Sequence, residues 1–155
     1  MTFRISSLDR GQFSHLFDLD DAALAGHGAV RRTAATRPGY PCRVSLADAE
    51  VGEEVLLVHF EHQSAASPFR ASHAVYVRPG AARAFPAVDD VPDLLRTRLL
   101  SLRAFDGAGM MVDADVVDGA DVEALITRML ADPAADYLHI HFARPGCYAA
   151  RVDRA

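Results

Sequence analysis

The chain has 155 residues, of which 50% are hydrophobic and 24% charged, and its formal net charge is −5. This length and composition predict a single globular domain over residues 1–155 with a full hydrophobic core, and the negative charge argues against nucleic-acid binding. All 16 basic residues are arginines, so Schiff-base catalysis, lysine-anchored pyridoxal phosphate and a P-loop lysine are excluded.

The N-terminal part of the chain predicts short elements. Residues 3–5 alternate apolar and polar side chains, as a short strand does. Asp9 and Gln12 have the spacing of a capping box, which predicts a helix whose buried face begins at Phe13. A second short helix over 20–26 and a strand over 29–35 complete this part.

The rest of the chain predicts strands and two further helices. Strands are expected over 55–61 and 73–77, and a short helix begins at Pro92. Apolar residues recur with helical period over 122–130. Two hairpins are expected, one turning at 106–109 and joining strands 100–105 and 110–117, and one joining strands 137–142 and 147–152. In the first hairpin, we expect Met110, Val112, Ala114 and Val116 to face the core.

Because hairpins dominate and the helices are not spaced as β-α-β units, we expect an α+β fold. Its sheet should be mainly antiparallel, with two to four short helices packed on it. No domain linker or internal repeat interrupts this order.

The cellular setting follows from what the sequence does not contain. The longest aliphatic run, over 55–58, is far below the roughly 20 residues of a membrane span, and the N-terminus has no apolar signal region. We therefore expect a soluble cytoplasmic protein, with Cys42 and Cys147 as thiols. Lys and Asn are both absent, which fits a high-GC bacterial genome.

Two proline-containing loops place an arginine where it can bind an anion. The first loop contains Tyr40 and Arg43, and the second contains Ser67 and Arg70. Guanidinium groups held by stiff turns suit bidentate recognition of carboxylate or phosphate. We take binding of a small anion or an acidic peptide segment by Arg43 and Arg70 as the leading hypothesis, against the alternative that both arginines form structural ion pairs.

A second hypothesis is an enzyme with Cys42 as its nucleophile or redox thiol. The adjacent Arg43 could lower the pKa of the thiol, and His73 could act as the base. Whether the protein is an enzyme stays open, and no cofactor is implied.

A third hypothesis is a metal site at His139 and His141, which share one face of a strand. In a regular antiparallel pairing, Arg151 lies opposite His139 and Ala149 opposite His141, and a neighbouring guanidinium opposes a dication. His59 and His62 are three residues apart on what looks like one strand, so they point to opposite faces and cannot easily share an ion. An exposed polar sheet face is the alternative.

Several stretches together resemble a known bacterial family. They are YPCR at Tyr40, GEE at Gly52, SPFR at Ser67, DGAGMMVDADVVDG at Asp106 and GCYAARVDR at Gly146. The chain is similar along nearly its whole length to the domain-of-unknown-function family 1203. The resemblance implies a stand-alone protein and carries over Cys42, Arg43, Ser67 and Arg70 as candidate positions, without an activity.

Overall fold

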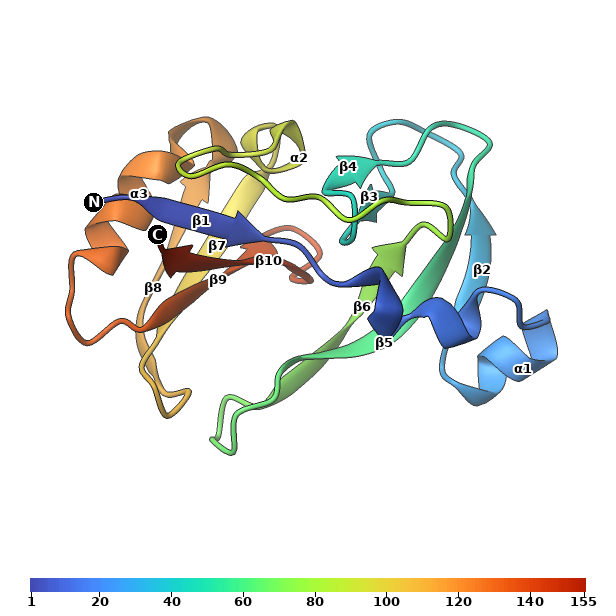
Figure 1. Cartoon of the computed structure of the whole chain (residues 1–155), viewed down its shortest axis with the longest axis horizontal. Coiled ribbons are helices and arrows are strands. Elements are labelled where there is room, and N and C mark those ends of the chain that lie inside the picture. Colours follow the sequence, from blue (N-terminus) through green and yellow to red (C-terminus); the bar gives the residue numbers. More distant parts are fainter. The chain divides into compact units, whose positions relative to one another are not determined.

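A computed structural model describes residues 1–155 and places them in two compact units, each built from separate stretches of the chain (Figure 1). Unit 1 contains residues 1–6, 61–73 and 85–155, and unit 2 contains residues 7–60 and 74–84. Three α-helices and two mostly antiparallel sheets confirm an α+β fold. None of the helices combines the length and apolar character needed to span a bilayer.

The sheet of unit 1 has five strands, and every neighbouring pair is antiparallel. In spatial order the strands are β1 (Phe3–Ser6), β10 (Tyr148–Arg154), β9 (Tyr137–Phe142), β7 (Leu99–Phe105) and β8 (Met111–Asp118).

One face of this sheet forms the core of unit 1. Leu102 lies opposite Ile140 in the register of β7 and β9, and both side chains are fully buried. Helix α3 (Val122–Leu130) packs against β7, β8 and β9, with its apolar stripe buried, as the helical period predicted. The other helical elements of unit 1 are α2 (Asp93–Arg96) and the 3₁₀ turn η3 (Gly119–Asp121).

Unit 2 is built around the second sheet. Its strands, in spatial order, are β2 (Val30–Thr33), β5 (Glu54–Gln63), β6 (Ala71–Val77), β3 (Pro41–Cys42) and β4 (Ala47–Asp48). The pair β3 and β6 is parallel. β5 begins in unit 2 and ends in unit 1, whereas β6 begins in unit 1 and ends in unit 2. The loop between these two strands belongs to unit 1.

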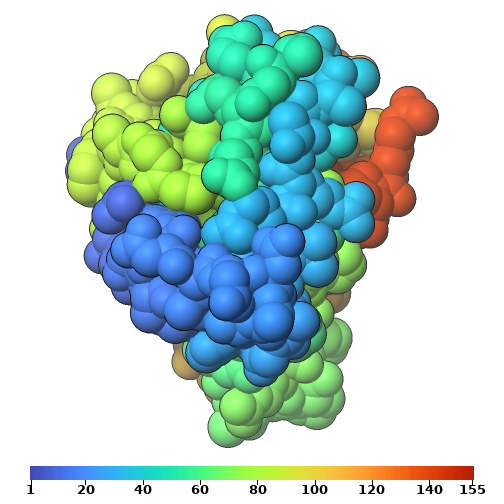
Figure 2. Space-filling view, turned by 90° about the vertical axis from the view of Figure 1, so that its right-hand side faces the viewer, coloured from blue at the N-terminus to red at the C-terminus, as the bar shows by residue number.

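The N-terminal segment of unit 2 is helical in short pieces: η1 (Arg10–Gln12), η2 (Ser14–Leu16) and α1 (Asp21–Gly26). Ser7 and Arg10 donate hydrogen bonds to the carbonyls of Ala84 and Pro79. In Figure 2 the blue atoms of this segment accordingly adjoin the yellow-green atoms that precede residue 85.

The helix predicted from Asp9 is corrected to two 3₁₀ turns. Asp9 caps the N–H of Gly11, two residues on, so the reciprocal bond of a capping box does not form. Gly11 disfavours a helix, and Phe13, with φ −121° and ψ −10°, interrupts it. The helix over 20–26 is present, with Asp20 as its N-cap.

A second correction concerns β8, which is an edge strand with no buried residue. The face expected in the core is exposed, including Val112 and Val116. On the helix side, Asp113 and Asp115 each pair with Arg128 of α3. Alternation therefore predicted two distinct faces on this strand, but the face expected in the core is the more exposed one, and no residue on either face is fully buried.

Candidate metal centre

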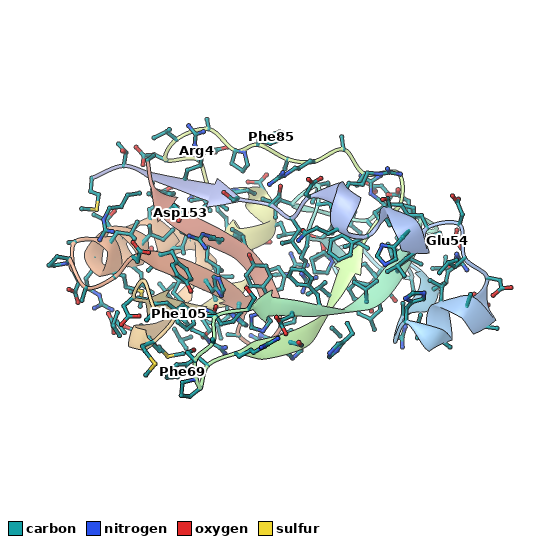
Figure 3. All side chains as sticks on the ribbon, turned by 60° about the horizontal axis from the view of Figure 1, so that its bottom comes forward. Arg4, Glu54, Phe69, Phe85, Phe105 and Asp153 are labelled. Carbon is teal, nitrogen blue, oxygen red and sulfur yellow. The ribbon has the colours of Figure 1, made fainter.

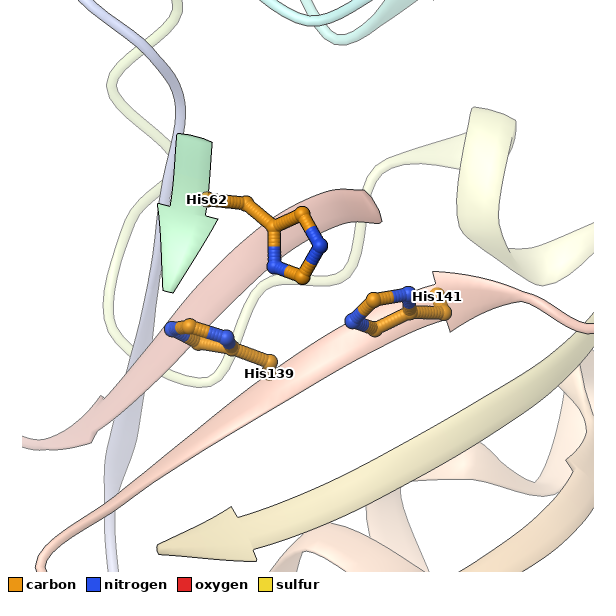
Figure 4. Close-up of side chains that lie close together, drawn as sticks. All are labelled: His62, His139 and His141. Atoms are coloured by element: carbon orange, nitrogen blue, oxygen red, sulfur yellow. The ribbon is translucent and has the colours of Figure 1, made fainter. Parts of the chain in front are cut away.

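Three histidines from two strands gather in unit 1 (Figure 4). His139 and His141 lie two apart on β9, so they point to the same face, away from the Leu102–Ile140 core. His62, near the end of β5, faces them. One ring nitrogen of each histidine lies within 4.8 Å of the corresponding nitrogens of the other two.

A nitrogen on each ring is buried without a hydrogen-bond partner. These atoms are Nδ1 of His62, Nδ1 of His139 and Nε2 of His141. His139 and His141 are only 3% and 1% exposed. Leaving a buried polar atom unpaired costs on the order of 1–3 kcal/mol, so three such atoms in one place require an explanation.

A backbone carbonyl orients the ring of His141. Its Nδ1 lies 3.0 Å from the carbonyl oxygen of Gly146, and because a carbonyl only accepts, Nδ1 carries the proton. The lone pair is then on Nε2, the atom without a partner. A histidine held this way by its second nitrogen is the usual arrangement around a bound metal. Gly146, at φ +80°, occupies the turn that brings this carbonyl back, a backbone conformation that favours glycine.

All three imidazoles are neutral at pH 7. Burial is the main cause that lowers the pKa of His62 to about 4 and those of His139 and His141 to about 3. The charges of neighbouring histidines and of Arg103 lower them further. Neutral imidazole is the form that ligates a metal, so no proton has to leave before binding.

Aromatic rings surround the histidines. Tyr148 stacks on His62 with the ring centroids 5.4 Å apart and the planes 7° from parallel, and it meets His139 and His141 edge-on. The rings of Phe105 and Tyr137 also contact the ring of His139. In Figure 3, Phe69 from the loop between β5 and β6 lies beside Phe105, with their centroids 6.2 Å apart.

A β-bulge places Tyr148 on the histidine face. The register of β9 and β10 shifts between Tyr148 and Ala150, so that Tyr148 lies opposite His141. The prediction that Ala149 lies opposite His141 is therefore wrong, because it assumed a regular ladder, whereas a bulge turns the preceding side chain to the other face. The prediction that Arg151 lies opposite His139 is confirmed.

Arg151 repels a cation bound at the histidines less strongly than the sequence implied. Its guanidinium binds both carboxylate oxygens of Asp153 and lies over the ring of Tyr137, 4.1 Å from the centroid. Asp153 thus offsets much of its charge. A second arginine, Arg103 of β7, also lies opposite His139, and the sequence did not single it out.

The candidate residues of the first loop lie in unit 2. Tyr40 packs on the ring of Tyr76. Arg43 is 1% exposed and donates from Nη1 to the carbonyl of Pro41 at 2.7 Å. Cys42 is a free thiol that is fully buried in β3, where its sulfur accepts a hydrogen bond from the N–H of Arg78. This burial counts against attack by the Cys42 thiol on a soluble substrate.

The candidate residues of the second loop lie in unit 1. The hydroxyl of Ser67 donates to the carbonyl of Gly109 at 2.9 Å, which ties the loop to the turn between β7 and β8. Arg70 is exposed and pairs with Glu61 at 3.1 Å. Binding of an anion by Arg43 and Arg70 stays a prediction.

His73 is near the histidine cluster, since its charge contributes to the lowered pKa values of His62 and His141. Sequence reasoning therefore found His73, His139 and His141 but set aside His62. Alternation along β5 puts His62 on the same face as Val58, which is buried, and Phe60, which is partly buried. This alternation was the pattern in the sequence that could have indicated His62.

The comparisons with known proteins support the resemblance found in the sequence. Residues 39–154 match the family described as "Protein of unknown function (DUF1203)", and this span includes all three clustered histidines. No curated protein and no solved structure matches the chain. Because the match covers well over half of its length, the chain belongs to the DUF1203 family of proteins of unknown function.

Proposed function

We propose that this protein binds one divalent transition-metal ion, of the Zn²⁺ type, through His62, His139 and His141. Two observations carry the proposal: one ring nitrogen from each histidine converges with the other two, and each ring has a buried nitrogen without a hydrogen-bond partner. Imidazole nitrogen suits Zn²⁺, Cu²⁺, Fe²⁺ and Ni²⁺, whereas Mg²⁺ and Ca²⁺ prefer oxygen.

The spacing of the nitrogens fits this proposal. Two nitrogens at about 2.05 Å from a tetrahedral Zn²⁺ lie about 3.3 Å apart. The nitrogens here lie within 4.8 Å of one another, a difference that small rotations of the side chains can close. Because the Gly146 carbonyl already orients the His141 ring, metal binding loses less side-chain conformational entropy at this ligand.

Three protein ligands leave a fourth position of a tetrahedral ion for water or substrate. Catalytic zinc sites have this arrangement, whereas structural sites use four protein ligands. The function that this geometry supports best is therefore a metal centre with a reactive open position.

Metal analysis of protein prepared without a histidine tag tests the proposal. After loading with Zn²⁺ and dialysis, we expect one ion per chain. His139→Phe should lose the ion, because phenyl fills the place among the neighbouring rings and supplies no ligand. His59→Gln is the matched control, since His59 is exposed on the same strand as His62 and should leave binding unchanged.

Clearly substoichiometric zinc in the wild-type protein would contradict the proposal. So would equal zinc contents of the wild type and His139→Phe. Loading with Co²⁺ gives an independent readout, because four-coordinate Co²⁺ absorbs strongly in the visible range.

A further inference from the structure

Arg103 adds a cation beside the three histidines. It lies directly opposite His139 in the register of β7 and β9, so its side chain leaves the sheet on the histidine face. Its charge lowers the pKa of His62, His139 and His141, in each case after the larger effect of burial. Its guanidinium is therefore within electrostatic range of the whole cluster.

No carboxylate compensates this guanidinium. Burial lowers the pKa of Arg103, and no acidic group raises it. Arg151, the other arginine opposite His139, differs in this respect: the hydrogen bonds of Asp153 raise its pKa. Of the two cations beside His139, only Arg103 can direct a full charge at a bound molecule.

The ligands themselves bring no negative charge, because all three are neutral imidazoles. A divalent ion beside Arg103 would give the site a formal charge of +3 among the rings of Phe105, Tyr137 and Tyr148. Repulsion between charges is stronger at partly buried positions than in bulk water, and His62 and Arg103 are both partly buried. An anion at the open position removes this repulsion and is attracted by both cations.

We propose that the open coordination position takes an oxyanion, a carboxylate or a phosphate, one oxygen of which binds the metal while Arg103 donates N–H groups to another. This proposal names the substrate class of the metal centre and rests on the proposed function. The planar guanidinium fork matches the spacing of two oxygens on one carboxylate or phosphate.

Anion titration of the Co²⁺-loaded protein tests the proposal. Acetate and inorganic phosphate are the probes, and the visible spectrum of Co²⁺ reports the dissociation constant of each. Imidazole is the control ligand, because it is neutral and binds the metal without needing a cation. The variants are Arg103→Gln, Arg103→Lys and, as a matched control, Arg151→Gln.

In Arg103→Gln we expect at least one anion to bind about 10- to 100-fold more weakly, the effect of losing a charge-assisted hydrogen bond, with imidazole unchanged. Arg103→Lys should fall between this variant and the wild type, which keeps the test valid if Arg103→Gln does not fold. Arg151→Gln should change anion affinity less than Arg103→Gln. Whichever probe depends more on Arg103 identifies carboxylate or phosphate as the preferred group.

Equal anion affinity in wild type and Arg103→Gln would overturn the inference while leaving the metal centre intact. Equal weakening of imidazole and anions would also overturn it, because that pattern means a damaged metal site. If the wild-type protein takes up no Co²⁺ or Zn²⁺, the proposed function fails first, and metal stoichiometry shows this before any anion is added.

Discussion

Acid should destabilise the metal-free protein through His139 and His141. In the unfolded chain each has the ordinary histidine pKa of 6.5, whereas in the folded protein each has a pKa of about 3. Between these values the unfolded state binds a proton and the folded state does not, so the free energy of unfolding falls as the pH falls. Well above pH 6.5 neither state is protonated, and the effect vanishes.

The magnitude follows from the pKa difference. Each pH unit below 6.5 costs about 1.4 kcal/mol per histidine. At pH 5.0, 1.5 units below 6.5, each of these histidines should lower the free energy of unfolding by about 2 kcal/mol, and the two together by about 4 kcal/mol. His62 adds a smaller amount, because it is partly exposed.

Urea unfolding at pH 8.0 and pH 5.0, in the presence of EDTA, measures this effect. His139→Phe should lose about 2 kcal/mol less than the wild type between the two values. At pH 8.0 the variant should be within about 1.5 kcal/mol of the wild type, since the swap is similar in volume and removes a nitrogen that makes no hydrogen bond. Exposed His59 is the control, and His59→Gln should keep the wild-type pH dependence.

Identical pH dependence in the wild type and His139→Phe would refute the reasoning. It would mean that the His139 ring accepts a proton in the folded protein as easily as in the unfolded chain. Comparing variants cancels the contribution of carboxylates, which both proteins share.

Three further outcomes are expected. Zn²⁺ at 1,000 times its dissociation constant should raise the free energy of unfolding by about 4 kcal/mol, and a melting curve should show this gain largely abolished in His62→Gln. Gly119→Ala should lower the free energy of unfolding, measured by urea titration, by about 2 kcal/mol or more, because an added Cβ would overlap backbone carbonyls of the α2 segment. A variant as stable as the wild type would contradict that packing. Leu102→Ala should cost about 2–5 kcal/mol, whereas Leu99→Ala, at a position 39% exposed on the same strand, should cost less than half as much in the same titration.

The candidate site was only partly predictable. Alternation along residues 137–142 was enough to place His139 and His141 on one face, because a strand repeats every two residues. No pattern in the sequence indicates the bulge at Tyr148. A regular ladder therefore predicted Ala149 opposite His141, one residue away from the observed partner, Tyr148. His62 and Arg103 came to the same face only through the packing of β5 and the order of β9 and β7.

By itself the sequence determined the local elements and the family. The helical period of the apolar residues over 122–130 predicted α3, and the residue patterns predicted the strands over 55–61, 73–77 and 137–142. The short sequence stretches within residues 39–154 identified the DUF1203 family. These properties depend on neighbours in the chain or on residue identity. The proposed metal centre depends on strands that are distant in sequence, because β5, β7, β9 and β10 each contribute a side chain. Only the tertiary structure brings three neutral imidazoles, a stacked tyrosine and an uncompensated arginine together.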